Sequence, residues 1–197
     1  MWSSEVTNMI ITGIWETLYM TLVSTLVGYV IGLPMGIILT VSDKDGIKPN
    51  AVLYKILDVI ANIVRSVPFI ILLVLLIPFT RLVVGKSYGS TATIVPLVIA
   101  AAPYIARMVE SSLKEVDAGV IEAARSMGAT ITLGTILGYS AMSGAVGGGG
   151  LGAIAIRYGY TRWQTDIMIV TVILLIILFQ IFQTVGMKLA DKFDHRK

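Results

Sequence analysis

The chain has 197 residues, of which 56% are hydrophobic and 14% charged, and its mean hydropathy is +0.86. This composition excludes an ordinary soluble domain, in which about 25% of residues are charged, and indicates a membrane protein. Disulfides are excluded because the chain has no cysteine, and zinc or heme sites are not expected because its one histidine, His195, lies in the polar tail. The formal net charge of +3 is small, so the placement of the basic residues carries more information than their sum.

Stretches between charged residues predict where the chain crosses the bilayer, because a spanning helix needs about 20 apolar residues. The five predicted spans are 15–41, 66–84, 90–107, 131–148 and 167–187. The second span includes Arg81, which we place near the interface, where a long side chain reaches water. The predicted fold class is therefore an all-α membrane protein with five transmembrane helices, forming a single domain over residues 1–197.

Basic residues in the connections predict the orientation of the chain. One side carries ten Lys and Arg residues, in the segments 44–55, 107–125 and 188–197, and the other side carries four: Arg81, Lys86, Arg157 and Arg162. Arg65 is assigned to neither side. The first side is therefore predicted to be cytoplasmic, with the N-terminus outside and the C-terminus inside. Residues 1–13 contain no Lys or Arg, so we do not expect a secretory signal peptide.

Glycine and proline are the small and helix-breaking residues of the predicted spans. Glycine recurs at four-residue spacing, which predicts close helix packing: Gly28, Gly32, Gly36, Gly134, Gly138, Gly144, Gly148 and Gly152. Prolines within the spans predict kinks and weakly indicate a pathway, because irregular backbone in a membrane needs protein or water beside it: Pro34, Pro68, Pro78, Pro96 and Pro103.

Several catalytic and carrier motifs are excluded by their context. Gly147, Gly149 and Gly152 satisfy G-x-G-x-x-G but follow a predicted span rather than a strand, so a dinucleotide site is rejected. The chain lacks a Walker sequence and cannot hydrolyse ATP by that route. A proton-coupled carrier is disfavoured because Glu16, at one edge, is the sole acidic residue of the predicted spans. Asp58 and Arg65 are assigned to an interfacial helix before the second span, and no catalytic residue or metal site is predicted.

The segment 109–129, on the predicted cytoplasmic side, indicates a short amphipathic helix outside the bilayer. Apolar residues recur on one face, Asp117 is a suitable N-cap, and Gly128 is a suitable C-terminal stop. Such a helix must bury its apolar face on lipid or on a partner, and amphipathicity alone favours lipid.

The sequence Glu122-Ala123-Ala124-Arg125-Ser126-Met127-Gly128 resembles the E-A-A-x-x-x-G core of permease subunits of ABC importers. With residues 65–73, 77–81 and 138–152, it makes the chain similar to the methionine-importer branch of that family, from about Gly13 to the last span. The resemblance implies a type I permease fold whose short coupling helix docks on a separate ATPase. It assigns this docking to four residues: Glu122, Ala123, Ala124 and Gly128.

The resemblance also implies the partners and location of the protein. It implies a homodimer in the bacterial plasma (inner) membrane, with two copies of an ATP-hydrolysing subunit and an external substrate-binding protein. ATP and Mg would be held by the ATPase, so the chain itself is expected to be a transport subunit without enzymatic activity, cofactor or nucleic-acid partner. Methionine as substrate follows from the resemblance alone.

One departure from the family concerns the segment after the coupling helix. The family has a further stretch with an Ile-x-Leu-Pro element there, whereas Gly128-Ala129-Thr130 continues directly into Ile131. This is either a true deletion, which would put ATPase coupling in doubt, or an omission of unresolved residues. We favour the omission and expect a break in the structure between Gly128 and Ile131.

For the translocation pathway, the small and polar residues of the fourth span are the candidates: Tyr139, Ser140, Met142 and Ser143. The flexible thioether of Met142 suits an adaptable apolar plug. Simple helix packing explains these residues equally well. Two other functions remain open, an ATP-independent oligomeric channel or secondary carrier and a scaffold subunit, although a channel does not explain the helix around Glu122.

Overall fold

The computed structural model describes residues 4–114, 132 and 134–193, and this part of the chain is helical, without strands. The helices are α1 (Ser4–Ser42), α2 (Ala51–Ser66), α3 (Phe69–Leu75), α4 (Ile77–Val84), α5 (Ser90–Lys114), α7 (Gly150–Ile154) and α8 (Thr165–Phe193). A 3-10 turn, η1 (Gly144–Val146), and a π-helical turn, η2 (Ala155–Tyr160), lie before and after α7, and residues 134–143 are also helical. The predicted all-α class is confirmed.

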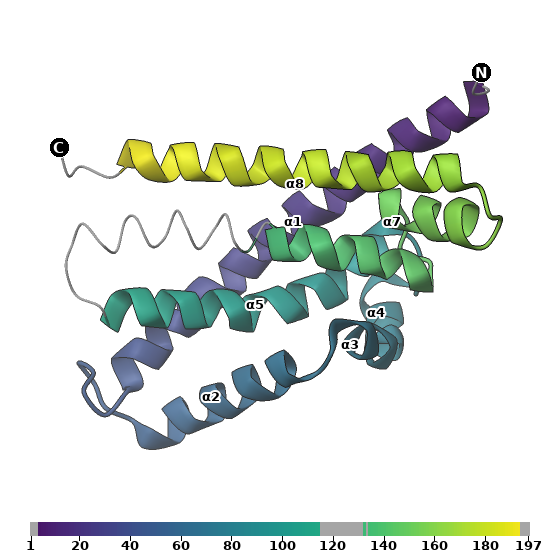
Figure 1. The fold of residues 1–197 in the computed structure, drawn as a ribbon. Helices are drawn as coiled ribbons and strands as arrows, with labels where there is room; N and C mark the ends of the chain where they lie inside the picture. Colours follow the sequence, from purple (N-terminus) through teal and green to yellow (C-terminus); the bar gives the residue numbers. More distant parts are fainter. Residues whose placement is uncertain (1–3, 115–131, 133, 194–197) are drawn as a thin grey trace.

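Three of the described helices are long and apolar enough to cross a membrane: α1, α5 and α8. The pair α2 and α3 raises this number to four if the bent pair counts as one span. In Figure 1 the C-terminal ends of α1, α5 and α8 lie at one end of the bundle, and α4, α7 and η2 lie at the other. We call these the junction end and the opposite end.

The second predicted span differs from the structure. Residues 66–84 do not form one helix, because α3 and α4 are separated at Leu76, with Pro78 in the first turn of α4. Instead α3 follows α2 across a bend of 107°. The bend has a local cause: Val67 is extended, with φ −83° and ψ 125°, as expected for the residue before Pro68.

Glycines on one face of α1 allow this helix to lie against the backbone of α5. A Cβ atom added to Gly32 would lie 2.6 Å from the carbonyl oxygen of Ala102, and one on Gly36 would lie 2.6 Å from that of Ala106. Gly28 and Gly32 are buried in the same contact, where Ile105 and its neighbours form the core. The four-residue glycine spacing in α1 therefore has the packing role that it predicts.

A glycine turn at the opposite end closes the fourth helical segment onto α1. Gly147, Gly149 and Gly150 have φ angles of 83°, 81° and 73°, which favour glycine. The Gly150 N–H donates to the Glu16 carboxylate at 2.6 Å, and the Leu151 N–H donates to the Thr17 hydroxyl at 2.9 Å. The one acidic residue of the predicted spans thus holds a turn in place.

The α1–α5 contact can be tested with two Gly→Ala variants that gain the same helix propensity. A Cβ atom at position 36 would lie 2.6 Å from the Ala106 carbonyl oxygen, whereas one at position 138 would meet nothing within 4 Å. Gly36→Ala should therefore destabilise the fold by about 1–3 kcal/mol through overpacking. Gly138→Ala should leave stability unchanged or slightly higher. Thermal unfolding in detergent, followed by circular dichroism, measures both, and equal midpoints would contradict the close approach of α1 and α5.

Candidate functional site

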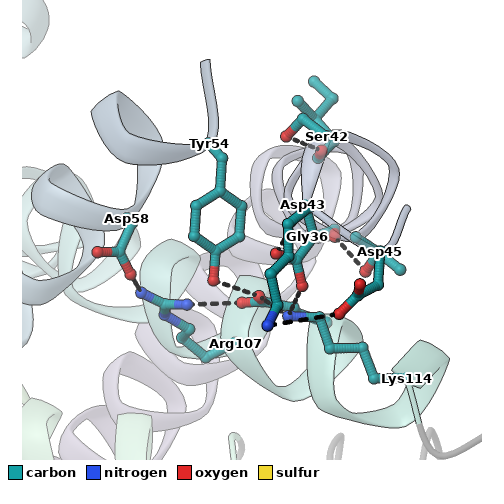
Figure 2. Close-up of polar contacts among 12 residues, drawn as sticks. Gly36, Ser42, Asp43, Asp45, Tyr54, Asp58, Arg107 and Lys114 are labelled. Atoms are coloured by element: carbon teal, nitrogen blue, oxygen red, sulfur yellow. Dashed lines mark hydrogen bonds and ion pairs between the residues drawn. The ribbon is translucent and has the colours of Figure 1, made fainter. Parts of the chain in front are cut away.

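A cluster of charged and polar side chains joins three helices at the junction end of the bundle. We call it the polar junction, and Figure 2 shows its contacts. It combines one residue after α1, two from α2 and three from α5: Asp43, Tyr54, Asp58, Arg107, Glu110 and Lys114.

Glu110 is the centre of the polar junction, and the residue is 4% exposed. One carboxylate oxygen accepts from the Tyr54 hydroxyl at 3.1 Å and from the Lys114 ammonium at 2.7 Å. The other oxygen accepts from the Arg107 guanidinium at 2.6 Å. A buried carboxylate is costly unless it is paired and hydrogen-bonded, so Glu110 requires these donors to stay together.

Arg107 connects α5 to α2. Its guanidinium donates to the Asp58 carboxylate as well as to Glu110, and it also reaches the side-chain oxygen of Asn62 at 3.3 Å. The planar guanidinium has five donors in a fixed geometry, which lets one side chain serve two carboxylates at once. The α2 helix is therefore attached to α5 through its polar face.

Lys114 extends the junction to the end of α1. Its ammonium lies 2.6 Å from the Asp43 carboxylate and 2.7 Å from that of Glu110. The hydrogen bond from Lys114, with that from the Lys44 N–H, holds the pKa of Asp43 below its usual value. The stabilisation from this lowered pKa is present above the ordinary pKa of an aspartate and is lost as pH falls through the lowered value. At neutral pH, Asp43 is therefore ionised and carries the charge that pairs with Lys114.

A cavity of about 220 Å³ lies where α2 ends. Its walls come from the α2–α3 bend, from the middle of α5 and from the helical segment around residue 136. The lining residues are Val64, Arg65, Val67, Phe69, Leu72, Ala100, Ala101, Tyr104, Thr132, Thr135, Ile136 and Tyr139. The rings of Phe69 and Tyr139 stack across two of these walls, with centroids 4.4 Å apart and planes 5° from parallel.

The four predicted pathway residues do not share one environment. Tyr139 lines the cavity, and Met142 is 54% exposed. Ser140 and Ser143 are 1% and 0% exposed, and their hydroxyls donate to the backbone carbonyls of Leu137 and Ser140 at 2.7 Å. The structure therefore brings Tyr139 to a cavity and packs the two serines within their own helix.

The predicted ATPase-docking residues lie outside the described residues, as does the predicted break between Gly128 and Ile131: Glu122, Ala123, Ala124 and Gly128. Within the described part of the chain, no group of three metal-ligating side chains gathers.

Sequence reasoning missed the polar junction. It placed Glu110 and Lys114 in the segment 109–129, predicted as an amphipathic helix outside the bilayer, whereas the structure includes residues up to Lys114 in α5. It also assigned Asp58 to an interfacial helix. The spacing of Arg107, Glu110 and Lys114 at intervals of three and four residues is a signal that these side chains share one helix face. The pairing of this face with Asp58 on α2 carries no such signal, because it joins residues far apart in the sequence.

Comparison with known proteins places the chain among transporters. The sequence profile of the family described as binding-protein-dependent transport system inner membrane component matches residues 28–131. The probable D-methionine transport system permease protein MetI of Vibrio cholerae is 45% identical over 217 residues, covering 99% of this chain and 96% of that protein. The D-methionine transport system permease protein MetI of Escherichia coli K12 is 48% identical over 158 residues, covering 69% of this chain and 73% of that protein.

A solved structure gives the same result for the fold. A native crystal form of the MetNI methionine ABC transporter in inward-facing conformations superposes with a TM-score of 0.93. The two chains are 44% identical, and the match covers 98% of this chain and 99% of the other.

The match to the Vibrio cholerae protein is longer than this chain. The match to the Vibrio cholerae protein extends over 217 residues, whereas this chain has 197, so at least 20 aligned positions are occupied in the relative alone.

Proposed function

The chain belongs to the family of binding-protein-dependent transport system inner membrane components, and from this premise we propose that it is the membrane-spanning permease of an ATP-driven methionine importer. The observation that carries the proposal is the match to the MetNI methionine ABC transporter, with 44% identity over 98% of the chain. An ATP-independent channel or secondary carrier has no comparable support.

The proposal includes the partners and the orientation. Two permease copies would work with two copies of an ATPase, which holds ATP and Mg, and with an external substrate-binding protein. Hydrolysis would reside in the ATPase, and this chain would supply the path. The protein would lie in the bacterial plasma membrane with its N-terminus outside and its C-terminus inside, which fits the basic residues that follow α1 or lie in the last turns of α8, such as Lys48 and Lys188.

In this mechanism, ATP binding closes the ATPase dimer and displaces the docking segment around Glu122, Ala123, Ala124 and Gly128. This segment begins eight residues after Lys114, the last residue of α5, so we expect its movement to reach the end of α5. The polar junction holds that end to α2 through Arg107 and Asp58, and α2 leads to the bend that forms one wall of the cavity. The α2 helix would therefore act as a lever in alternating access.

The proposed pathway passes Tyr139, Ser140, Met142 and Ser143. Tyr139 contributes to the cavity wall and stacks on Phe69, so a displacement of the α2–α3 bend would separate the two rings. The buried serines pack the same helix and would set its position, whereas the exposed thioether of Met142 is free to close or open a path.

The importer proposal is tested by uptake of labelled methionine into proteoliposomes. We expect uptake when this chain, its ATPase, the binding protein and internal ATP are all present, and loss of uptake when any one is omitted. The energy for accumulation comes from hydrolysis in the partner, so uptake by this chain alone, indifferent to ATP, would overturn the proposal in favour of a channel or carrier.

Two variants distinguish coupling to the ATPase from passage of methionine in the same assay. Glu122→Lys reverses the charge offered to the ATPase, so it should lower both the stimulation of ATP hydrolysis and the uptake, by tenfold or more for a lost charged contact of about 1.5–3 kcal/mol. Met142→Trp should obstruct the path and lower uptake while hydrolysis continues. Met142→Leu is the matched control and should retain uptake. Unchanged uptake in both Glu122→Lys and Met142→Trp would favour a scaffold subunit.

A further inference from the structure

Arg65 is an exposed cation that forms part of the cavity wall. It lines the cavity together with Ala100 and Tyr104 of α5. Helix α5 has 25 residues and is about 37 Å long, and Tyr104 lies about 15 Å along the axis from its end at Lys114. The predicted span of α5 ends at Arg107, so Tyr104 and Ala100 lie about 5 and 10 Å inside the edge of the bilayer at the junction end. A cation that lines a cavity near the edge of the bilayer is a candidate site for an anionic group.

Arg65 differs from Arg107 in its partners. Arg107 pairs with two carboxylates, whereas Arg65 makes no ion pair or hydrogen bond with another residue in the described ranges 4–114, 132 and 134–193. Arg65 lies in the last turn of α2, where a cation is favourable beside the helix dipole. That position explains why a cation is tolerated there, but it leaves the guanidinium donors free for an anion.

The rest of the cavity suits the apolar side chain of a small amino acid. Aliphatic side chains of Val67, Leu72 and Ile136 give an apolar surface, and the Tyr104 ring adds a hydroxyl. The volume of about 220 Å³ is below the range of drug-sized pockets, so it selects a small ligand. A guanidinium that donates hydrogen bonds to an anion, beside an apolar wall, matches an amino acid with a carboxylate and an apolar side chain.

We propose that Arg65 and this cavity form a transient binding site for an amino acid with an apolar side chain, with the Arg65 guanidinium holding the carboxylate during passage. The planar guanidinium binds a carboxylate through two parallel hydrogen bonds, which a lysine ammonium does not reproduce. The proposal rests on the importer function and names the ligand group that the permease itself recognises.

The absence of cysteine from the chain provides a direct test. Ala100→Cys introduces one thiol at the cavity, and Ala153→Cys introduces a control thiol at a separate cavity of about 410 Å³ at the opposite end. In the complete transporter, labelling of each thiol by a small maleimide is followed by mass spectrometry of this chain. Methionine at millimolar concentration should slow labelling at position 100 and leave position 153 unaffected, and methioninamide, which lacks the carboxylate, should protect neither.

Arginine variants then test whether Arg65 is responsible for the protection by methionine. Adding Arg65→Met to Ala100→Cys should raise the methionine concentration for half-protection by about tenfold or more, the factor expected for a lost charged hydrogen bond. Arg65→Lys should fall between the two. Arg81→Met, which removes an exposed arginine of α4, should leave protection unchanged.

Equal protection by methioninamide, or full protection in Arg65→Met, would overturn the proposal. A labelling rate that responds to the anionic lipid content of the vesicles and not to methionine would also overturn it, because Arg65 would then bind lipid phosphate. Uptake is measured on the same preparations. ATP-dependent uptake without Arg65-dependent protection would contradict the binding site and support the importer function. Protection without uptake would support the binding site and contradict the importer function.

Discussion

The buried carboxylate of Glu110 is the constraint on which the arrangement of the helices depends. A charge at this position is stable only while donors surround it, and the donors come from different elements: Tyr54 from α2, and Arg107 and Lys114 from α5. Arg107 and Lys114 are in turn neutralised by Asp58 and Asp43, on α2 and after α1. The requirement to satisfy one carboxylate therefore fixes the ends of three helices relative to one another.

The fixed junction end explains how the rest of the fold is arranged. Close backbone contact at Gly32 and Gly36 makes α1 and α5 a tightly packed pair, and the polar junction attaches α2 to that pair at a single end. The far end of α2 breaks at Val67–Pro68, where the cavity and the Phe69–Tyr139 stack lie. A helix held at one end and bent at the other is suited to convert movement of α5 into a change at the cavity.

The sequence predicted those features that depend on composition and on local spacing. Long uncharged stretches identified the helices that became α1, α5 and α8, and glycine spacing identified the packed face of α1. The kink at Pro68 was predicted, but Asp58 and Arg65 made the preceding helix resemble an interfacial one, so the pairing of α2 with α3 across the bend was not. Cross-helix pairs such as Asp58 with Arg107 depend on the tertiary fold, and the hydroxyl of Ser143 turns to its own backbone, so neither can be read from spacing.

The most direct test of this account is the number of methionine molecules imported per ATP hydrolysed by a Glu110→Gln transporter. The amide has nearly the same size but lacks the charge that holds Arg107 and Lys114 together, so we predict continued ATP hydrolysis with a strongly reduced ratio. Asp45→Asn, at an exposed pair with Lys44, is the matched control and should retain the original ratio. An unchanged ratio in a correctly folded Glu110→Gln transporter would contradict the role of the polar junction as the link between the ATPase and the cavity.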